Sequence, residues 1–212
     1  MPSSAVPAKD RVYACVKERV LSGAYPGGEL LSEGEVAAAL GVSRTPVREA
    51  FLLLEAEDLM RLYPKRGALV VPVSPDEIRD VVVARRLVVR HSAAAVAASP
   101  PAALVAELRA LVREQEEREA AGDTAGFVDA DRRFHQAIVA AAGNAVILRL
   151  YDSLRDRQRR MVSASIARDP GAVATFIAEH QAIVGAIAGG RAADAGELLA
   201  EHITSAGARL QT

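Results

Sequence analysis

Apolar residues recur at helical spacing along most of the chain. In the segment 9–22 they stand three or four positions apart, which predicts a helix. These apolar positions are Val12, Val16 and Val20. Gly23 ends that helix, and Ser32 with Glu35 has the S-x-x-E spacing of a capping box. The pattern therefore predicts a second, short helix that reaches Leu40.

A third helix is predicted from Ser43 to about Asp58. Gly41 can adopt the left-handed conformation that ends a helix, Ser43 offers an N-cap hydroxyl, and Pro46 falls in the first turn, where its missing N–H is tolerated. At about 100° per residue, one side of this helix is apolar. That side consists of Val47, Ala50, Phe51 and Leu54. A different, exposed side near the start of the helix carries Arg44, Thr45 and Arg48.

Two short strand-like runs follow at 59–63 and 68–71, joined by the basic turn Pro64–Gly67. Three helices and a basic hairpin together indicate a winged helix-turn-helix. Guanidinium groups and a hydroxyl at the start of a docked helix suit DNA phosphates and guanine edges, and a basic wing tip can reach the phosphates or minor groove beside them. The alternative is a surface helix with solvated arginines beside an ordinary polar hairpin turn.

The segment 72–76 has the proline-rich composition of a linker, and we place a domain boundary there, between residues 1–73 and 74–212. Every segment beyond it has helical character. The expected helices span about 75–98, 100–121, 123–142, 144–167, 170–188 and 191–210. Their two-residue joins favour an antiparallel helical bundle in which consecutive helices pack side by side. The charged run 114–119 reads as a solvated helix face without a function.

Composition narrows these possibilities. The 212 residues are 50% hydrophobic and 4% aromatic, which favours a mainly α protein with sizeable cores. The net charge of −1 means that nucleic acid would be bound by a local basic patch. The single cysteine, Cys15, excludes an internal disulfide, fits a reducing cytoplasm and is expected to be a small core residue of the first helix. No signal peptide or membrane-spanning run is visible, so we expect a cytoplasmic protein without membrane contact.

A possible metal site lies in the C-terminal region, which holds all four histidines. Asp131 and His135 are four positions apart and therefore point from one side of one helix, while His180 and His202 border apolar positions of two later helices. Three nitrogen donors and one oxygen donor suit zinc, and also nickel, manganese or iron. The alternative is that each histidine is separately hydrogen-bonded or exposed. His91 has no such pairing and is left out of the site.

Several motifs resemble a known family. Gly23–Leu30 (GAYPGGEL), Leu40–Ala50 (LGVSRTPVREA) and Pro64–Gly67 (PKRG) resemble the GntR family of bacterial transcription regulators. Asp131–His135 (DRRFH), followed by Gly143–Asn144, is similar to the D-x-x-F-H…G-N signature of the FadR-type effector domain, called the FCD domain. The resemblance covers nearly the whole chain and implies an FCD-like helical bundle after the winged domain.

The resemblance implies particular roles for residues of both domains. His180 and His202, 22 residues apart, fall where the FCD domain's other two metal-binding histidines are expected. The family implies a homodimer that binds a short palindromic operator in double-stranded DNA, with the bundle sensing a small organic acid through or beside a divalent metal. The residues carried over as DNA contacts are Ser43, Arg44, Thr45, Arg48, Lys65, Arg66 and Gly67.

The effector site implied by the resemblance centres on Arg86, which matches an arginine of the first bundle helix that commonly faces the effector pocket. Its guanidinium could grip a carboxylate with two hydrogen bonds, and Arg157 or Arg160 would assist on the general ground that a cation suits an acid. Two positions depart from the family pattern. Gly34 replaces a longer, often basic residue that contacts phosphate, and Arg90 replaces an acidic residue of the first bundle helix, which changes the local ion pairing.

The leading hypothesis is a metabolite-responsive transcription regulator, with repression as its expected mode. A second hypothesis makes the metal site catalytic, for example in a hydrolase that activates water, although beyond the four ligands no convincing general base is visible. A third takes the metal as purely structural, with the effector bound elsewhere or absent.

Overall fold

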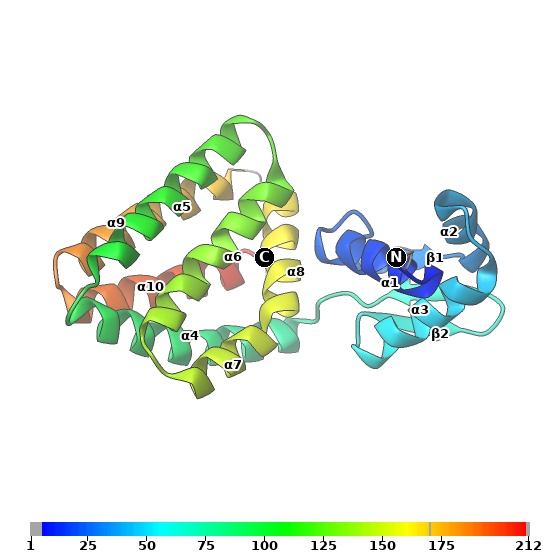
Figure 1. Cartoon of the computed structure of the whole chain (residues 1–212), viewed down its shortest axis with the longest axis horizontal. Coiled ribbons are helices and arrows are strands. Elements are labelled where there is room, and N and C mark those ends of the chain that lie inside the picture. Colours follow the sequence, from blue (N-terminus) through cyan, green and yellow to red (C-terminus); the bar gives the residue numbers. More distant parts are fainter. Residues whose placement is uncertain (1–5, 170, 211–212) are drawn as a thin grey trace, which may run out of the picture. The chain divides into compact units, whose positions relative to one another are not determined.

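The computed structural model describes residues 6–169 and 171–210. The chain forms two compact units, of which the first ends at Val73 and the second begins at Ser74 (Figure 1). Over residues 6–73, the first unit contains three helices and a small sheet. Its elements are α1 (Ala8–Leu21), β1 (Leu30–Leu31), α2 (Glu33–Leu40), α3 (Arg44–Ala56), β2 (Met60–Tyr63) and β3 (Gly67–Val70). The sheet is antiparallel with the order β1-β3-β2, so the wing hairpin carries a third strand. The two-residue strand β1 was not predicted, because it is too short to show an alternating pattern.

Local sequence signals set the ends of the helices in this unit. The Ser32 hydroxyl accepts a hydrogen bond from the Gly34 N–H (3.2 Å) at the start of α2. Gly41 ends α2 in the left-handed conformation with φ 63°. Ser43 stands at the N-cap position of α3 in an extended conformation, but its side chain makes no capping hydrogen bond. The expectation of a capping hydroxyl at Ser43 was therefore wrong, which leaves that hydroxyl free of a helix-capping role.

The core of the first unit lies between α1, α3 and the sheet. The apolar side of α3 is completely buried, as its pattern predicted. Buried with it are Val12, Val16 and Val20 of α1. Cys15, expected in the core, is only half-buried and lies outside this cluster. The reason is helical geometry, since a residue one position before Val16 is rotated by about 100° from the buried stripe.

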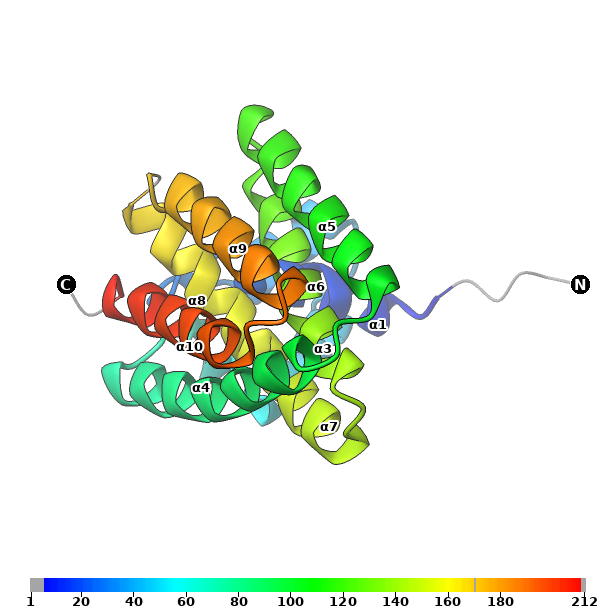
Figure 2. The ribbon, with the colours of Figure 1, turned by 90° about the vertical axis from the view of Figure 1, so that its left-hand side faces the viewer.

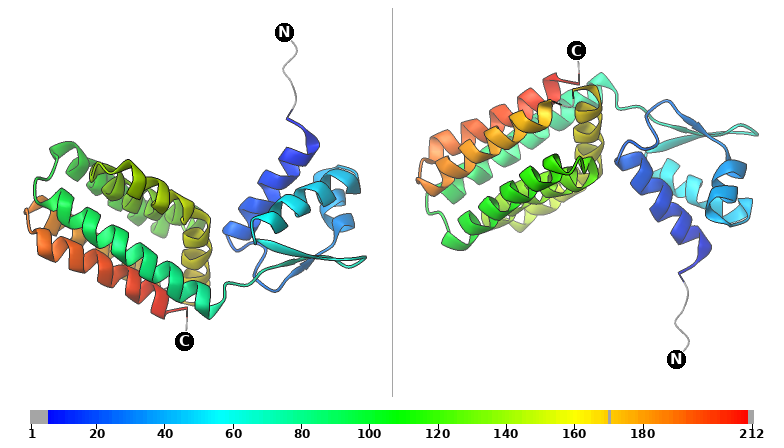
Figure 3. Two further views of the ribbon diagram at one scale, coloured as in Figure 1. Left: turned by 90° about the horizontal axis from the view of Figure 1, so that it is seen from below. Right: turned by 90° about the horizontal axis from the view of Figure 1, so that it is seen from above.

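Over residues 74–169 and 171–210, the secondary structure of the second unit consists of helices alone. Its elements are α4 (Pro75–Ala97), α5 (Ala102–Ala120), α6 (Thr124–Ala141), α7 (Ala145–Ser153), α8 (Arg155–Arg168), α9 (Ala172–Ala188) and α10 (Ala192–Ala208). The single helix expected over 144–167 is two helices, and the chain changes direction between them at Leu154 (Figure 3). The Leu154 N–H bonds to the Tyr151 carbonyl three residues back (3.1 Å), which tightens the turn. Neither glycine nor proline marks this bend, so packing decides it.

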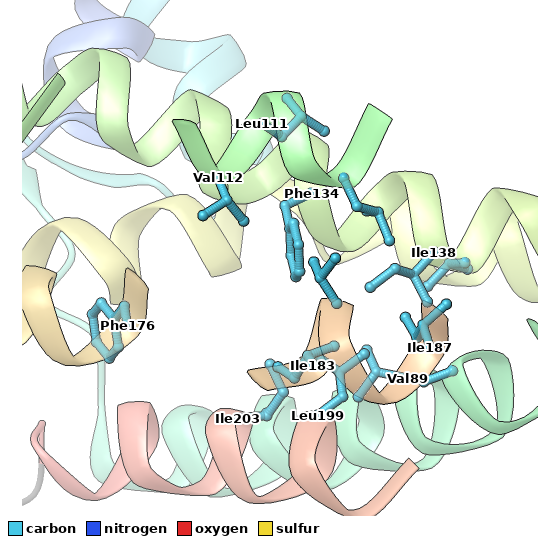
Figure 4. Close-up of a cluster of buried hydrophobic side chains, with 14 of the residues drawn as sticks. Val89, Leu111, Val112, Phe134, Ile138, Phe176, Ile183, Ile187, Leu199 and Ile203 are labelled. Atoms are coloured by element: carbon cyan, nitrogen blue, oxygen red, sulfur yellow. The ribbon is translucent and has the colours of Figure 1, made fainter. Parts of the chain in front are cut away.

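The helices of the second unit enclose one large core. α4 lies along α10, and α5 packs on both α6 and α9 (Figure 2). Consecutive helices do pack side by side for α5–α6 and α9–α10, but the main neighbours of α4 are α10 and α6 and not α5. The close-up in Figure 4 shows the interior that these helices share. Its side chains include Val89, Phe134, Ile138, Ile183, Ile187, Leu199 and Ile203. Among the described residues, no helix combines the length and apolar character needed to cross a bilayer.

Candidate functional site

Exposed basic residues gather at the start of α3. Arg44, Thr45 and Arg48 are exposed there, while Val47 and Phe51 on the other side of the helix are fully buried. In the part of the chain that the structure describes, no carboxylate pairs with Arg44 or Arg48. Both guanidinium groups therefore keep their donors available beside the positive end of the helix dipole, where an anion is favoured.

Gly34 of α2 lies directly beneath one of these arginines. A Cβ atom built on Gly34 would lie 3.3 Å from Nη2 of Arg44 and 3.6 Å from its Cζ. The guanidinium of Arg44 thus lies over the space that a side chain at position 34 would fill. Because position 34 is glycine, the Arg44 side chain covers this surface of α2.

The turn between β2 and β3 presents two more cations. Lys65 and Arg66 are exposed, Lys65 has φ 63°, and the Arg66 N–H closes the turn on the Tyr63 carbonyl (3.0 Å). Gly67 has φ 110°, and a Cβ atom there would lie 2.1 Å from the Leu31 carbonyl oxygen. The structure therefore gives Gly67 a role in the sheet itself, because only glycine permits this close approach of β3 to β1.

Four ligand-type side chains converge inside the second unit. Asp131 and His135 come from α6, His180 from α9 and His202 from α10, and one potential ligand atom of each lies within 4.8 Å of the others. The Nε2 atoms of His180 and His202 are 3.3 Å apart, and Oδ1 of Asp131 is 3.6 Å from Nε2 of both His135 and His180. Each side chain is almost completely buried. Phe134 stacks on the His180 ring with centroids 4.2 Å apart, which fixes that ring.

Two hydrogen-bond acceptors hold this cluster from outside. Oε1 of Gln115 lies 2.8 Å from Nδ1 of His180, and Oε2 of Glu179 lies 2.6 Å from Nδ1 of His202. Sequence reasoning missed both residues. It placed Gln115 in a solvated run without function, but Gln115 is fully buried. Its position four residues after Leu111, on the buried stripe of α5, was the available signal.

The burial of the cluster sets its protonation. Burial lowers the pKa of His135 to about 4, with Asp131 partly opposing this shift, and burial also lowers the pKa of His180 well below its usual value. Burial alone would raise the pKa of Asp131, but the fields of the three histidines, His135 above all, hold it well below its usual range. At neutral pH the site therefore offers a carboxylate together with neutral imidazoles at His135 and His180, which are the ligand forms that bind metals.

The residues present fit a divalent transition metal. Both ring nitrogens of His135 are buried without a hydrogen-bond partner. Buried polar atoms are costly when unpaired, and a cation held by Asp131 and the three histidines would satisfy one of the two nitrogens of His135. Three imidazoles and one carboxylate are a donor set for zinc, nickel, manganese or iron.

Three unpaired polar groups lie beside the cluster. Nε of Arg85, the Tyr151 hydroxyl and Nε2 of Gln158 are buried and lack a hydrogen-bond partner of normal geometry. Burial raises the pKa of Tyr151, while Arg85 and Gln158 lower it and Asp131 raises it, so all four groups are neighbours. The field of Arg85 also lowers the pKa of His135. These groups can donate hydrogen bonds to an anion next to the cluster.

The two predicted effector arginines, Arg86 and Arg160, differ in exposure. Arg86 lies on the exposed side of α4 beside Leu87. Arg85 precedes it by one position, and one position along a helix turns a side chain by about 100°. The arginine of α4 that faces the cluster is therefore Arg85. Arg160 is buried in α8, where burial lowers its pKa and Glu77 raises it.

The two remaining arginines of interest form ion pairs on the surface. Arg157 pairs with Glu77 (3.5 Å), and Arg90 pairs with Glu197 of α10. The departure at Arg90 thus joins α4 to α10 and contributes no charge to the interior.

A winged helix-turn-helix with exposed cations, followed by a helical unit with an enclosed polar site, defines a ligand-responsive DNA-binding regulator. Comparison with known families is specific. Residues 8–70 match the bacterial regulatory proteins of the gntR family, and residues 80–205 match the FCD domain. The chain therefore belongs to the GntR family and carries an FCD domain, which makes it a DNA-binding transcription regulator and not an enzyme.

Individual relatives agree with this assignment. An uncharacterized HTH-type transcriptional regulator of Streptomyces ambofaciens, in an unstable DNA locus, is 31% identical over 84% of this chain and 75% of its own length. The galactonate operon transcriptional repressor of Escherichia coli (strain K12) is 25% identical over 84% of this chain and 86% of its own. The crystal structure of a putative GntR transcriptional regulator from Rhodococcus sp. RHA1 aligns with a TM-score of 0.76 and 27% identity, covering 96% of this chain and 97% of that one.

Proposed function

We propose that this protein is a repressor whose affinity for its operator is controlled by a small organic acid bound at or near a divalent metal in the second unit. The observation that carries the proposal is the adjacency of two buried groups of atoms. One is the ligand set Asp131, His135, His180 and His202. The other is the set of unpaired donors on Arg85, Tyr151 and Gln158. Residues 1–73 serve as the DNA-binding domain and residues 74–212 as the effector-binding and dimerising domain of the FadR type.

The start of α3 is proposed to read DNA in the major groove. Exposure and the absence of paired carboxylates support direct contacts from Arg44, Thr45 and Arg48. The Ser43 hydroxyl makes no helix-capping hydrogen bond and can therefore bind a phosphate at the same end of the helix. Lys65 and Arg66 contact the backbone or the minor groove from the wing, and Gly67 shapes the turn that presents them.

The metal is proposed to be held by Asp131, His135, His180 and His202. Zinc fits this donor set best, with nickel, manganese or iron as the other candidates. When bound, the ion supplies a Lewis-acidic centre that attracts the carboxylate of an acid. The protein's own residues supply the selectivity, because they orient the imidazoles and exclude bulk water.

The effector is proposed to be a small carboxylic acid. A buried guanidinium, a phenol hydroxyl and an amide in one place are donors that suit a carboxylate and its neighbouring hydroxyls. The name of the galactonate operon repressor supports this class, since galactonate is a hydroxylated carboxylic acid. Arg85 takes the role first expected for Arg86, and Arg160 contributes positive charge from α8.

A homodimer on a short palindromic operator completes the proposal. Val83 and Leu87 on α4 are 58% and 72% exposed, and Val146 and Leu150 on the adjoining α7 are also exposed. Large apolar side chains on neighbouring helices favour burial against a second copy. The substitution Leu87→Glu should lower the dimer fraction in sedimentation experiments, and an unchanged sedimentation coefficient would argue against this surface.

The effector can control DNA binding only if it binds two conformations of the dimer with different affinities. A suitable test measures operator binding by the zinc-loaded protein across a panel of small carboxylic acids that includes galactonate, with galactose as the uncharged control. Operator release by an acid, abolished by chelation of the metal, is the expected result. Operator binding that no acid changes with or without metal would contradict the proposal.

The variant His135→Ala separates a sensory metal from a purely structural one. If the metal is sensory, this variant keeps the helical fold and loses the response to the acid. Loss of the fold in the variant and in the chelated protein would instead assign the metal to structure alone.

A further inference from the structure

We propose that Gln115 and Glu179 are positioning residues that set the metal affinity of the cluster, an inference that rests on the proposed metal site. Each accepts a hydrogen bond from the Nδ1 atom of one histidine, at 2.8 Å for Gln115 with His180 and at 2.6 Å for Glu179 with His202. Neither residue contributes a ligand atom to the cluster.

The chemistry of the acceptors decides which nitrogen carries the proton. An ionised carboxylate can only accept, so Nδ1 of His202 must hold the proton that it shares with Glu179. The carbonyl oxygen of Gln115 imposes the same tautomer on His180. When both rings are neutral, as metal ligands must be, the lone pair then lies on Nε2, the atom that faces the cluster.

These tautomers bring the lone pairs of the two Nε2 atoms and of an Asp131 oxygen close together. The two Nε2 atoms are 3.3 Å apart, and a carboxylate oxygen of Asp131 lies 3.6 Å from the one on His180. Two Nε2 atoms without protons cannot hydrogen-bond to each other, but both can bind a cation placed between them. Gln115 and Glu179 therefore hold the two rings in the orientation that a metal ion requires.

The two acceptors differ in how firmly they are held. Glu179 is ionised, and its second oxygen accepts from the Ser205 hydroxyl (3.3 Å), one turn after His202 on α10. Nε2 of Gln115 is buried without a partner, so His180 is the neighbour that orients its amide. A turned amide would donate to Nδ1 and place the proton on Nε2 of His180, towards His202. Glu179 is thus held at both oxygens, whereas the orientation of the Gln115 amide depends on its contact with His180.

The experiment measures the dissociation constant for Zn²⁺ alone, by competition with a chromophoric chelator, in the full-length protein. Glu179→Ala and Gln115→Ala should each weaken zinc binding by about 10- to 100-fold. Glu179→Gln keeps an acceptor oxygen and should recover most of the affinity. In the Co²⁺-substituted protein, the visible spectrum of both alanine variants should shift, since their histidines are no longer held in place.

The chain offers a matched control on the same two helices. Gln181 of α9 donates to Glu116 of α5 (2.7 Å) on the surface, and these residues stand two positions after Glu179 and one position after Gln115. Glu116→Ala and Gln181→Ala should leave the zinc dissociation constant unchanged. The melting temperature of the chelated protein separates positioning from packing, because it should change little in Glu179→Ala.

The outcomes distinguish this inference from the proposed metal site. If the wild-type protein binds no zinc, the proposed metal site fails. If it binds zinc and both alanine variants bind it within about threefold of wild type, the metal site stands and the positioning role is wrong. If a variant binds weakly but its chelated form is equally destabilised, and Glu179→Gln recovers no affinity, the residue serves packing and the inference is overturned.

Discussion

Nε2 of His180 and Nε2 of His202 face each other at 3.3 Å although their helices, α9 and α10, are separated by a sharp turn at Gly189–Gly190. The outer nitrogens of both rings face acceptors, so the inner ones are the nitrogens available to a metal ion. In this buried site the contact is favourable only with a proton or a cation between the two nitrogens. Both the stability and the ligand chemistry of the second unit depend on that relationship.

The stability of the metal-free protein should fall on acidification. Burial lowers the pKa of His135 to about 4, below the 6.5 of an exposed histidine, so the unfolded chain binds more protons between these values. The contribution is complete above pH 6.5 and is lost as the pH falls to about 4. Its size is about 3 kcal/mol of unfolding free energy for His135 alone.

The free energy of unfolding of the chelated protein, measured in denaturant at a series of pH values, tests this prediction. The variant His135→Leu should have a weaker pH dependence between 6.5 and 4, where His180 still contributes, whereas the exposed His91→Ala should keep the dependence of the wild type. Equal slopes in the wild type and His135→Leu would show that His135 does not titrate with a lowered pKa.

The arginines at the start of α3 should contribute directly to DNA binding. Arg44→Ala and Arg48→Ala should each weaken operator binding by about 1–3 kcal/mol if they contact bases, and relax specificity at the contacted position. An operator selected from random duplexes, assayed by fluorescence anisotropy at fixed salt, makes this measurable. Arg109→Ala on the second unit removes the same charge and should have no effect. Full affinity in both α3 variants would exclude this helix as the reading element.

Gly67 should be required by the fold of the winged domain. An alanine there would place Cβ 2.1 Å from the Leu31 carbonyl oxygen at φ 110°, which we expect to cost at least about 2 kcal/mol of unfolding free energy. Gly28→Ala is the control, because Gly28 has φ 91° but nothing within 4 Å of a Cβ atom. It should lose only about 1 kcal/mol. Equal losses in the two variants, measured by denaturant unfolding, would refute the steric account.

Arg85 and Arg86 should respond oppositely to substitution. Arg85→Met should abolish the thermal stabilisation of the zinc-loaded protein by an active carboxylic acid, because the buried guanidinium is the charge beside the cluster. Arg86→Met removes the same charge from the exposed side of α4 and should leave that stabilisation intact. Thermal-shift titrations of both variants suffice, and the reverse pattern would restore Arg86 as the effector residue.

Short-range signals in the sequence determined much of the molecule. The periodicity of apolar residues defined the buried side of α3, and Gly41 followed by Ser43 marked its start. The spacing of Asp131 and His135 placed both on one side of α6. These features depend on residues within one or two turns of each other. Helical geometry alone therefore relates them, and sequence reasoning could reach them.

Features that depend on contacts between distant segments required the tertiary structure. Strand β1 exists because residues 30–31 pair with β3, and the break at Leu154 has no local helix breaker. The packing of α4 on α10 and α6 turns Arg85 inward and Arg86 outward, a difference of one position that composition cannot reveal. Gln115 looked like part of a charged surface until α9 placed His180 against it. Periodicity indicates that a side of a helix is buried, but only packing decides which neighbours each side chain meets.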